Sequence, residues 1–254
     1  MASGSEELIG LIPAAGKGLR LALPYPKELY PIIRDNHYKP VSQFVVDSLV
    51  SSGIHQVIFV INETKHQLMG YFGDGHRFGC NFGYAVQEQT SNHNPSTSPG
   101  LAHALDSAYP WVKGKTVFFG MADTIMEPED VFVRAWARAQ SDDEVVLVLF
   151  ETKRPEKFGM VRLDSANRVL EIVDKPVWTD LTKMWGCIIW RSRFTDFLHR
   201  SVQEDGMTDF AKILNNGIAA GFPMRGILIE DGNYSDLGTY DEIMELDNNL
   251  RRHH

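Results

Sequence analysis

Short apolar runs alternate with stretches of helical periodicity along the first 150 residues of the chain. Each run is bounded by turn-forming residues, so it predicts a buried β-strand. These runs lie at 8–12, 57–61, 82–86, 116–119 and 144–150. Helical spacing and helix-start signals predict helices between them, at 40–52, 63–72 and 128–139. Repeated strand–helix units of this length favour a mostly parallel sheet with helices on both faces.

The pattern changes after residue 150. Two short apolar segments, 159–163 and 168–173, flank Asp164-Ser165-Ala166-Asn167 and predict a β-hairpin. The remaining expected elements are strands at 184–190 and 224–229 and helices at 194–202, 208–218 and 240–250. Either Asp205 or Thr208 can cap the helix at 208–218, because both side chains accept hydrogen bonds from backbone N–H groups.

Composition narrows the classes of function. The formal charge of −8 and the isoelectric point near 5.6 argue against non-specific nucleic-acid binding, because the net field repels a phosphate backbone. No apolar run reaches the roughly 18 residues that a membrane span needs, and the acidic start MASGSEE is unlike a signal peptide. We therefore expect a cytoplasmic protein without nucleic-acid or membrane partners. We also expect free, buried thiols at Cys80 and Cys187, and exposed apolar residues in the second half that favour a homodimer.

The stretch 9–31, IGLIPAAGKGLRLALPYPKELYP, carries the strongest chemical signal. A P-loop has four residues between its glycines, whereas five separate Gly10 from Gly16, and Leu21 stands at the last glycine position of the dinucleotide fingerprint. What remains is a loop of backbone N–H groups beside basic side chains, which suits a triphosphate better than an ordinary turn. The loop residues are Ala14, Ala15, Gly16, Lys17 and Gly18, and the flanking cations are Arg20 and Lys27.

Charged residues also follow two of the predicted strands. Asp123 lies just past the carboxyl end of the strand at 116–119, so it is a magnesium candidate as well as a candidate turn cap. Asp174 and Lys175 follow the predicted hairpin. They form either a surface ion pair of little energetic value or a site where Asp174 holds a sugar hydroxyl and Lys175 a phosphate.

Residues 87–99, QEQTSNHNPSTSP, predict a loop because they are polar and lack periodicity. The loop is either a surface excursion or a mobile lid over a nucleotide. It ends at Gly100, which opens a helix and can offer its N–H to a base or phosphate. The terminal Arg251-Arg252-His253-His254 is assigned no function.

Six motifs in order resemble those of the sugar-1-phosphate nucleotidyltransferases of the glucose-1-phosphate thymidylyltransferase type. They are PAAGKGLR with PKELYP, GLAHAL, GMADT, FGMV with DKP, GMTD and YSDLGT. The resemblance implies a Rossmann-like three-layer α/β/α fold with a mixed, mostly parallel central sheet and a small β-hairpin acceptor lobe. It implies one domain over 1–254, with a nucleotide-binding half at about 8–150 and an acceptor-binding half at about 151–250. It also implies magnesium-dependent transfer of a nucleotidyl group from an NTP, with a pyrimidine favoured, to a sugar 1-phosphate in nucleotide-sugar and polysaccharide biosynthesis.

The resemblance also assigns roles to individual residues. The family's triphosphate loop matches Gly16, Gly18 and Arg20, and its phosphate-binding lysine matches Lys27. Its pyrimidine-reading position falls on Gln87, and its backbone contact to the base falls on Gly100. Its two magnesium ligands resemble Asp123 and Asp236, and its acceptor contacts fall on Gly159, Asp174 and Lys175.

The chain departs from the family in three places. Leu19 replaces a usual Thr, Asp174 replaces a more common Glu, and the loop before Gly100 is longer than usual. The short interval between Arg20 and Lys27 is closer to that of the methylerythritol-phosphate cytidylyltransferases.

Two alternatives stay open. One is a cytidylyltransferase that acts on a non-sugar phosphate or phosphonate such as phosphocholine. The other is a non-catalytic nucleotide-sensing module. A sensor has no need for two metal ligands together with an acceptor lysine, so Asp123, Asp236 and Lys175 argue against the second.

Overall fold

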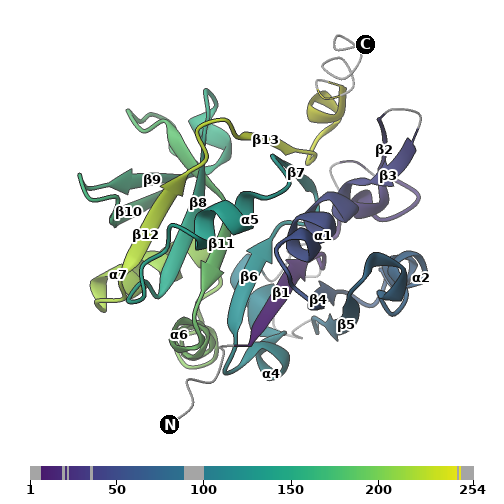
Figure 1. Cartoon of the computed structure of the whole chain (residues 1–254), viewed down its shortest axis with the longest axis horizontal. Coiled ribbons are helices and arrows are strands. Elements are labelled where there is room, and N and C mark those ends of the chain that lie inside the picture. The colour runs from purple at the N-terminus through teal and green to yellow at the C-terminus, as the bar shows by residue number, and fades with distance from the viewer. Residues whose placement is uncertain are drawn as a thin grey trace.

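A nine-stranded sheet forms the centre of the computed structural model, which describes residues 7–18, 21, 23–34, 37–88, 100–244 and 246 (Figure 1). Along one path the strands are ordered β10 (Val169–Asp174), β9 (Gly159–Leu163), β11 (Lys183–Trp190), β6 (Thr116–Gly120), β1 (Leu8–Pro13), β4 (Gln56–Ile61) and β5 (Asn81–Val86). The other two are β8 (Val145–Glu151), which pairs with β11, and β12 (Met224–Leu228), which pairs with β8. Of these described strands, β10 and β11 alone run against the rest. The predicted mixed, mostly parallel sheet is therefore confirmed.

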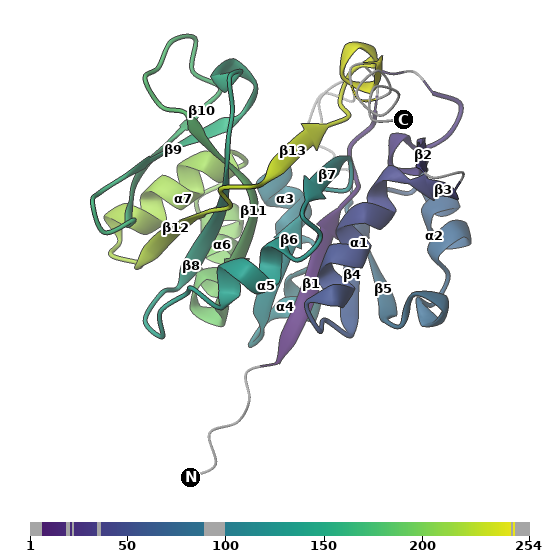
Figure 2. The same cartoon turned by 45° about the horizontal axis from the view of Figure 1, so that its top comes forward.

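Helices cover both faces of the sheet (Figure 2). One face packs against α1 (Val41–Ser51), α2 (His66–Phe72) and α5 (Val131–Trp136). The other packs against α3 (Leu101–Asp106), α4 (Tyr109–Val112), α6 (Ser192–Gln203) and α7 (Phe210–Ala219). Successive side chains of a strand point to opposite faces, so Ile9 and Leu11 of β1 enter one core cluster and Ile12 the other. This burial on both faces explains why the strands read as apolar runs, and it confirms the three-layer α/β/α architecture.

Strand β11 joins the two halves of the sheet. Its residues Cys187 to Trp190 pair with β6, whereas Met184, farther along the same edge, pairs with Met160 of β9. Strand β6 ends at Gly120, where the chain leaves the sheet and β9 replaces it beside β11. The sheet therefore opens at the carboxyl end of β6, the end at which ligands bind in open α/β sheets.

Two small antiparallel ladders were not predicted from the sequence. One is the hairpin of β2 (Pro31–Arg34) and β3 (His37–Pro40). The other joins β7 (Thr124–Glu127) to β13 (Asn233–Asp236), which lies far away in the chain. Strands of four residues carry too few positions for a detectable alternation of side chains, and no local pattern marks a partner so distant.

Several predicted helices begin later in the structure. Helix α2 starts at His66 rather than at residue 63, because the Asn62 side chain accepts the backbone N–H of Thr64 at 2.9 Å and forms a turn there. Helix α7 is capped by Asp209, which accepts the N–H of Lys212 at 3.2 Å, so both predicted caps, Asp205 and Thr208, are wrong. Helix α5 spans Val131–Trp136, a shorter range than the predicted 128–139.

Cys80 and Cys187 are both free and buried, as predicted. Burial raises the pKa of the Cys80 thiol to about 11 and raises that of Cys187 well above its usual value, so both stay protonated at neutral pH. Within the described ranges, no helix is long and apolar enough to cross a membrane.

Candidate active site

The loop after β1 lines a pocket of about 160 Å³ at the open end of the sheet. The N–H of Ala14 donates to the Val60 carbonyl at 2.7 Å, and the Asn62 side chain donates to the Ala15 carbonyl at 2.7 Å. These two bonds hold the start of the loop against β4. Ala14, Ala15 and Gly16 line the pocket, and the chain continues through Lys17 to Gly18, whose φ of +63° favours glycine. The predicted cation Arg20 lies outside the described residues.

Gln87 and Gly100 also line this pocket. In the sequence they stand on either side of residues 89–99, the predicted loop or lid, which lies outside the described residues. The Gln87 side chain is buried, and its Nε2 has no hydrogen-bond partner among the described residues. Gly100 precedes α3 with a φ of +92°, and a Cβ there would lie 2.8 Å from the Thr208 carbonyl oxygen. The buried amide nitrogen of Gln87 is therefore left unpaired, and position 100 requires glycine because a side chain there would collide with Thr208.

Lys27 forms an ion pair with Asp123 across this pocket. Both side chains are largely buried, with exposed fractions of 15% and 12%. Burial alone would lower the pKa of Lys27, but its attraction to Asp123, Glu28 and Asp236 outweighs that effect and raises the pKa. Lys27 therefore carries a full positive charge at neutral pH, and it interacts with both predicted metal ligands.

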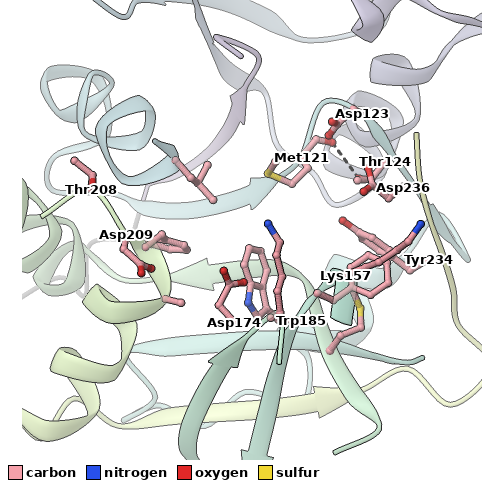
Figure 3. A pocket seen from close by; sticks show the side chains of 17 residues that line it. Met121, Asp123, Thr124, Lys157, Asp174, Trp185, Thr208, Asp209, Tyr234 and Asp236 are labelled. Carbon is pink, nitrogen blue, oxygen red and sulfur yellow. Dashed lines mark hydrogen bonds between the residues drawn. The ribbon is translucent and has the colours of Figure 1, made fainter. Parts of the chain in front are cut away.

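The ladder between β7 and β13 brings Asp236 to Asp123. Asp236 pairs with Thr124 in the ladder, and the N–H of Leu237 donates to the Asp123 carbonyl at 2.9 Å. Figure 3 shows the two carboxylates on the same side of the larger pocket. Burial, and then the charges of Asp236 and Asp123, raise the pKa of the nearby Tyr234 well above its usual value. That tyrosine therefore stays neutral beside the two acids.

The two aspartates fit a magnesium ion that completes its shell with substrate phosphates. Hard divalent cations of this kind are commonly held by one or two carboxylates plus phosphate oxygens and water. No group of three or more His, Cys, Asp or Glu side chains converges among the described residues, so a closed protein cage for a metal is not formed there. Asp123 was also a candidate turn cap, but its side chain pairs with Lys27.

The predicted acceptor residues line a second pocket of about 410 Å³ (Figure 3). Gly159 begins β9 and faces Asp174 at the end of β10. Lys175 follows with a φ of +45°, and its N–H donates to the Phe158 carbonyl at 3.0 Å, which fixes the turn. This pocket and the smaller one share Leu101, Met121 and Asp123, so the two predicted binding regions meet at Asp123.

The family model described as "Nucleotidyl transferase" matches residues 9–253.

The chain belongs to the nucleotidyl transferase family.

Relatives of this nucleotidyl transferase confirm the resemblance to sugar-1-phosphate enzymes. A glucose-1-phosphate thymidylyltransferase from Streptomyces griseus is 27% identical over 93% of the chain and 64% of its own length. A structure assigned as a glucose-1-phosphate thymidylyltransferase from Bacillus anthracis, in complex with sucrose, has a TM-score of 0.80 at 20% identity and covers 96% and 95% of the two chains. A UDP-glucose pyrophosphorylase from Acinetobacter baumanii has a TM-score of 0.74 at 18% identity and covers 93% and 90%. The chain spans only 44% to 64% of the length of the curated relatives it matches. The two structural likenesses establish the fold.

Sequence reasoning missed several side chains of this nucleotidyl transferase that line the larger pocket. They are Met121, Lys157, Trp185, Asp209, Phe210 and Tyr234. Met121, Asp209 and Tyr234 belong to the GMADT, GMTD and YSDLGT motifs and could have been found from them. Lys157, Trp185 and Phe210 lie outside the motif residues, and an aromatic residue within an apolar run normally indicates core.

A buried ion pair under the smaller pocket was also missed. Glu28 and Lys65 pair with side-chain exposures of only 2% and 5%, and Glu28 lines the pocket beside Lys27. Burial raises the pKa of Glu28 and lowers that of Lys65, which means that burial opposes both charges. Their mutual attraction offsets this cost. The pair sits behind Lys27, so it supports the position of the PKELYP motif.

We expect Lys65→Met to lower the free energy of unfolding by about 3–5 kcal/mol, because the Glu28 carboxylate is left buried without its partner. The double variant Glu28→Gln/Lys65→Met should lose less than the sum of the single losses. Urea unfolding at pH 7 measures both. Arg162→Met is the matched control, since its exposed pair with Glu171 should contribute at most about 1 kcal/mol. Equal losses for Lys65→Met and Arg162→Met would contradict this account.

Proposed function

We propose that this protein transfers a nucleoside monophosphate from an NTP, with dTTP, UTP or CTP favoured, to a sugar 1-phosphate and releases pyrophosphate. One observation carries the proposal. A pocket lined by the glycine loop and Lys27 meets a pocket lined by Lys175 at Asp123, and Asp236 lines the second pocket beside it. Such an arrangement can hold two phosphorylated substrates with their phosphates facing each other. The family membership supports the same reaction class.

The reaction requires charge compensation more than a base. A phosphate oxygen of the acceptor is already ionised at neutral pH and can attack the α-phosphorus directly. Repulsion between the two anions opposes this attack, so fixed positive charge accelerates it. In this proposal Arg20 and Lys27 bind the triphosphate, and Lys175 binds the acceptor phosphate. Asp123 and Asp236 would hold magnesium, and the chemistry that this ion supplies when bound is neutralisation of phosphate charge.

The remaining pocket residues orient the substrates. Gln87 has an unpaired, buried amide donor that suits a base oxygen, and the backbone at Gly100 is open to a base. Gly159 and Asp174 are proposed to contact the acceptor. Exposed apolar side chains in the second half, at Leu170, Val177 and Trp178, support the proposed homodimer.

A pyrophosphate-release screen tests the proposal. Each of dTTP, UTP, CTP, ATP and GTP is combined with a panel of sugar 1-phosphates and with phosphocholine, in buffer with magnesium chloride. We expect release with a pyrimidine nucleotide and at least one sugar 1-phosphate. Silence across the panel, with nucleotide binding intact, would favour a non-catalytic sensing module instead.

We predict that excess EDTA reduces pyrophosphate release to background and that added magnesium restores it, because the two aspartates face phosphates only through a cation. The control for loss of fold is the thermal unfolding of the protein without nucleotide, recorded with and without EDTA. Undiminished turnover in excess chelator would remove magnesium from the mechanism.

One observation favours a second candidate, a cytidylyltransferase for a cationic acceptor such as phosphocholine. Trp185 and Phe210 line the acceptor pocket as a perpendicular pair, with ring centroids 6.1 Å apart and an interplanar angle of 80°. Aromatic corners beside a carboxylate such as Asp174 suit quaternary ammonium groups. Turnover of phosphocholine but of no sugar 1-phosphate in the screen would select this candidate.

A further inference from the structure

A short segment near the end of the chain, residues 236–242, contacts both halves of the candidate site. It begins at Asp236 and continues through the YSDLGT motif to Glu242. The N–H of Leu237 donates to the carbonyl of Asp123 at 2.9 Å, so the segment is held where the two pockets meet. Figure 2 shows it beyond β13, above the end of β1. We call residues 236–242 the strap.

On one side, the strap holds the chain that follows the glycine loop. The Tyr240 hydroxyl donates to the carbonyl of Leu21. Leu21 is buried, and its own N–H donates to the Gly18 carbonyl at 3.3 Å, which closes a turn at the end of the loop. Leu21 also belongs to the same core cluster as Leu237 of the strap. The far end of the proposed triphosphate loop is therefore anchored to the strap by a hydrogen bond and by apolar packing.

On the other side, the strap holds a cation of the acceptor pocket. Lys157 lines that pocket, and its ammonium group donates to the Glu242 carboxylate at 2.5 Å. The Glu242 side chain is largely buried, with an exposed fraction of 9%. Burial alone would raise the pKa of Glu242, but hydrogen bonds from Lys157 and Thr239 and the charge of Lys157 outweigh that effect and lower it. Glu242 is therefore ionised at neutral pH, and its contact with Lys157 is a charged pair.

The backbone next to Lys157 carries this constraint to Lys175. Lys157 ends the short 3₁₀ helix η3 (Pro155–Lys157), and Phe158 follows it. The Phe158 carbonyl accepts the N–H of Lys175 at 3.0 Å, which is the bond that fixes the acceptor turn. The Phe158 ring also packs against Tyr234 of β13, with the ring centroids 5.8 Å apart. Through Lys157, Glu242 thus holds the backbone to which the proposed acceptor cation is bonded.

The two strap side chains, Tyr240 and Glu242, stand behind the pockets. Neither is among the described residues that line the nucleotide pocket or the acceptor pocket, so neither touches a substrate bound there. Their partners belong to different pockets, because Leu21 closes the glycine loop and Lys157 lines the acceptor pocket. A contact that only stabilised the fold would affect both substrates alike, whereas these two contacts reach separate sites.

We infer that the strap positions the two substrate sites separately. Tyr240 is a positioning residue for the NTP, because it fixes the end of the glycine loop. Glu242 is a positioning residue for the acceptor, because it fixes Lys157 and, through the backbone, the turn that carries Lys175. The inference rests on the proposed function for the identity of the two substrates. Removing one of these contacts therefore weakens the binding of one substrate and spares the other.

Tyr240→Phe tests the nucleotide side, since phenylalanine keeps the ring and removes the hydroxyl. We expect the KM for the NTP to rise roughly 3- to 10-fold, the value of one neutral hydrogen bond, with kcat and the acceptor KM within about twofold. Calorimetry with dTTP, UTP and CTP in magnesium buffer should show the same loss of affinity without an acceptor. Tyr84→Phe is the matched control, because the Tyr84 hydroxyl donates to the Gly73 carbonyl at 2.6 Å and Tyr84 lines neither pocket.

Glu242→Gln tests the acceptor side, since glutamine keeps the size of the side chain and removes its charge. We expect the acceptor KM to rise roughly 3- to 10-fold, with the KM for the NTP within about twofold. Because Glu242 acts through Lys157, the double variant Lys157→Met/Glu242→Gln should have the acceptor KM of Lys157→Met alone. Asp241→Asn is the matched control, because Asp241 is the exposed neighbour of Glu242 and lines neither pocket.

A variant that raises both KM values by the same factor, or neither of them, shows a contact that is only structural and overturns the inference. If a variant does not fold, hydrogen exchange of the wild-type protein decides. A non-hydrolysable NTP analogue should slow amide exchange in the strap several-fold, because coupling between two sites is reciprocal, and unchanged exchange overturns the inference. Calorimetry needs no turnover, so an unchanged nucleotide affinity of Tyr240→Phe overturns the inference alone. Silence of the wild-type protein in the release screen overturns the proposed function.

Discussion

Asp123→Asn is expected to reduce turnover at least about a hundredfold while the chain stays folded. The carboxylate lies where the two pockets meet, pairs with Lys27 and sits beside Asp236. The amide keeps the size of the side chain but removes one of the two charges proposed to hold magnesium. Losing a preorganised charge contact of this kind costs on the order of 3 kcal/mol of transition-state stabilisation, which is roughly a hundredfold in rate. Pyrophosphate release at saturating substrates measures the effect.

The control for this prediction is Asp142→Asn. Asp142 is exposed in a turn and lines neither pocket, so its loss of charge should leave turnover within about twofold. Circular dichroism should show the same secondary structure in both variants. An Asp123→Asn protein with near-normal turnover would remove Asp123 from the site.

Lys175→Ala should produce a loss of similar size but a different kinetic signature. Lys175 is exposed at the rim of the acceptor pocket, so its removal should cost little stability. Alanine and lysine both carry a Cβ, so the φ of +45° is about equally unfavourable for either residue. The substitution should therefore retain the turn. We expect kcat/KM for the acceptor to fall about a hundredfold or more, because the charge facing the acceptor phosphate is lost.

The KM for the NTP separates this role from a general effect on the enzyme. It should change by no more than about twofold, because Lys175 lines the acceptor pocket and not the smaller one. Lys153→Ala is the matched control, since Lys153 is exposed and lines neither pocket. If both lysine variants show the same modest loss, Lys175 has no specific role in binding the acceptor.

The order of strands and helices could be predicted from the sequence because periodicity is a local property. A strand buried on both faces, such as β8 with its run VVLVLFE, is predicted by a short, continuous run of apolar residues, many of them β-branched. The site residues at strand ends were also accessible. Asp123 follows the carboxyl end of β6, where ligands bind in open α/β sheets, and Asp174 ends β10, the second strand of the predicted hairpin. Ordered motifs then suggested the roles of Lys27, Lys175 and Asp236.

The errors have local causes too. Asp205 and Thr208 were chosen as caps because their residue types suit the position, but Asp209 is the residue whose side chain reaches the N–H of Lys212. The hairpin of β2 and β3 was missed because residues 31–40 contain prolines and charged residues and show no alternation of apolar and polar positions. In both cases, residue preferences were weaker than the geometry imposed by neighbouring elements.

The sequence by itself determined which segments become strands and helices, and it marked the glycine loop with Lys27 as a site for anions. Only the tertiary structure decided that Asp236 lies beside Asp123, that Glu28 pairs with Lys65, and that Trp185 lines the acceptor pocket. The reason is physical. The first of these proximities depends on the pairing of β13 with β7 and the last on one bulge in β11, and contacts between distant segments leave no periodic trace in either segment.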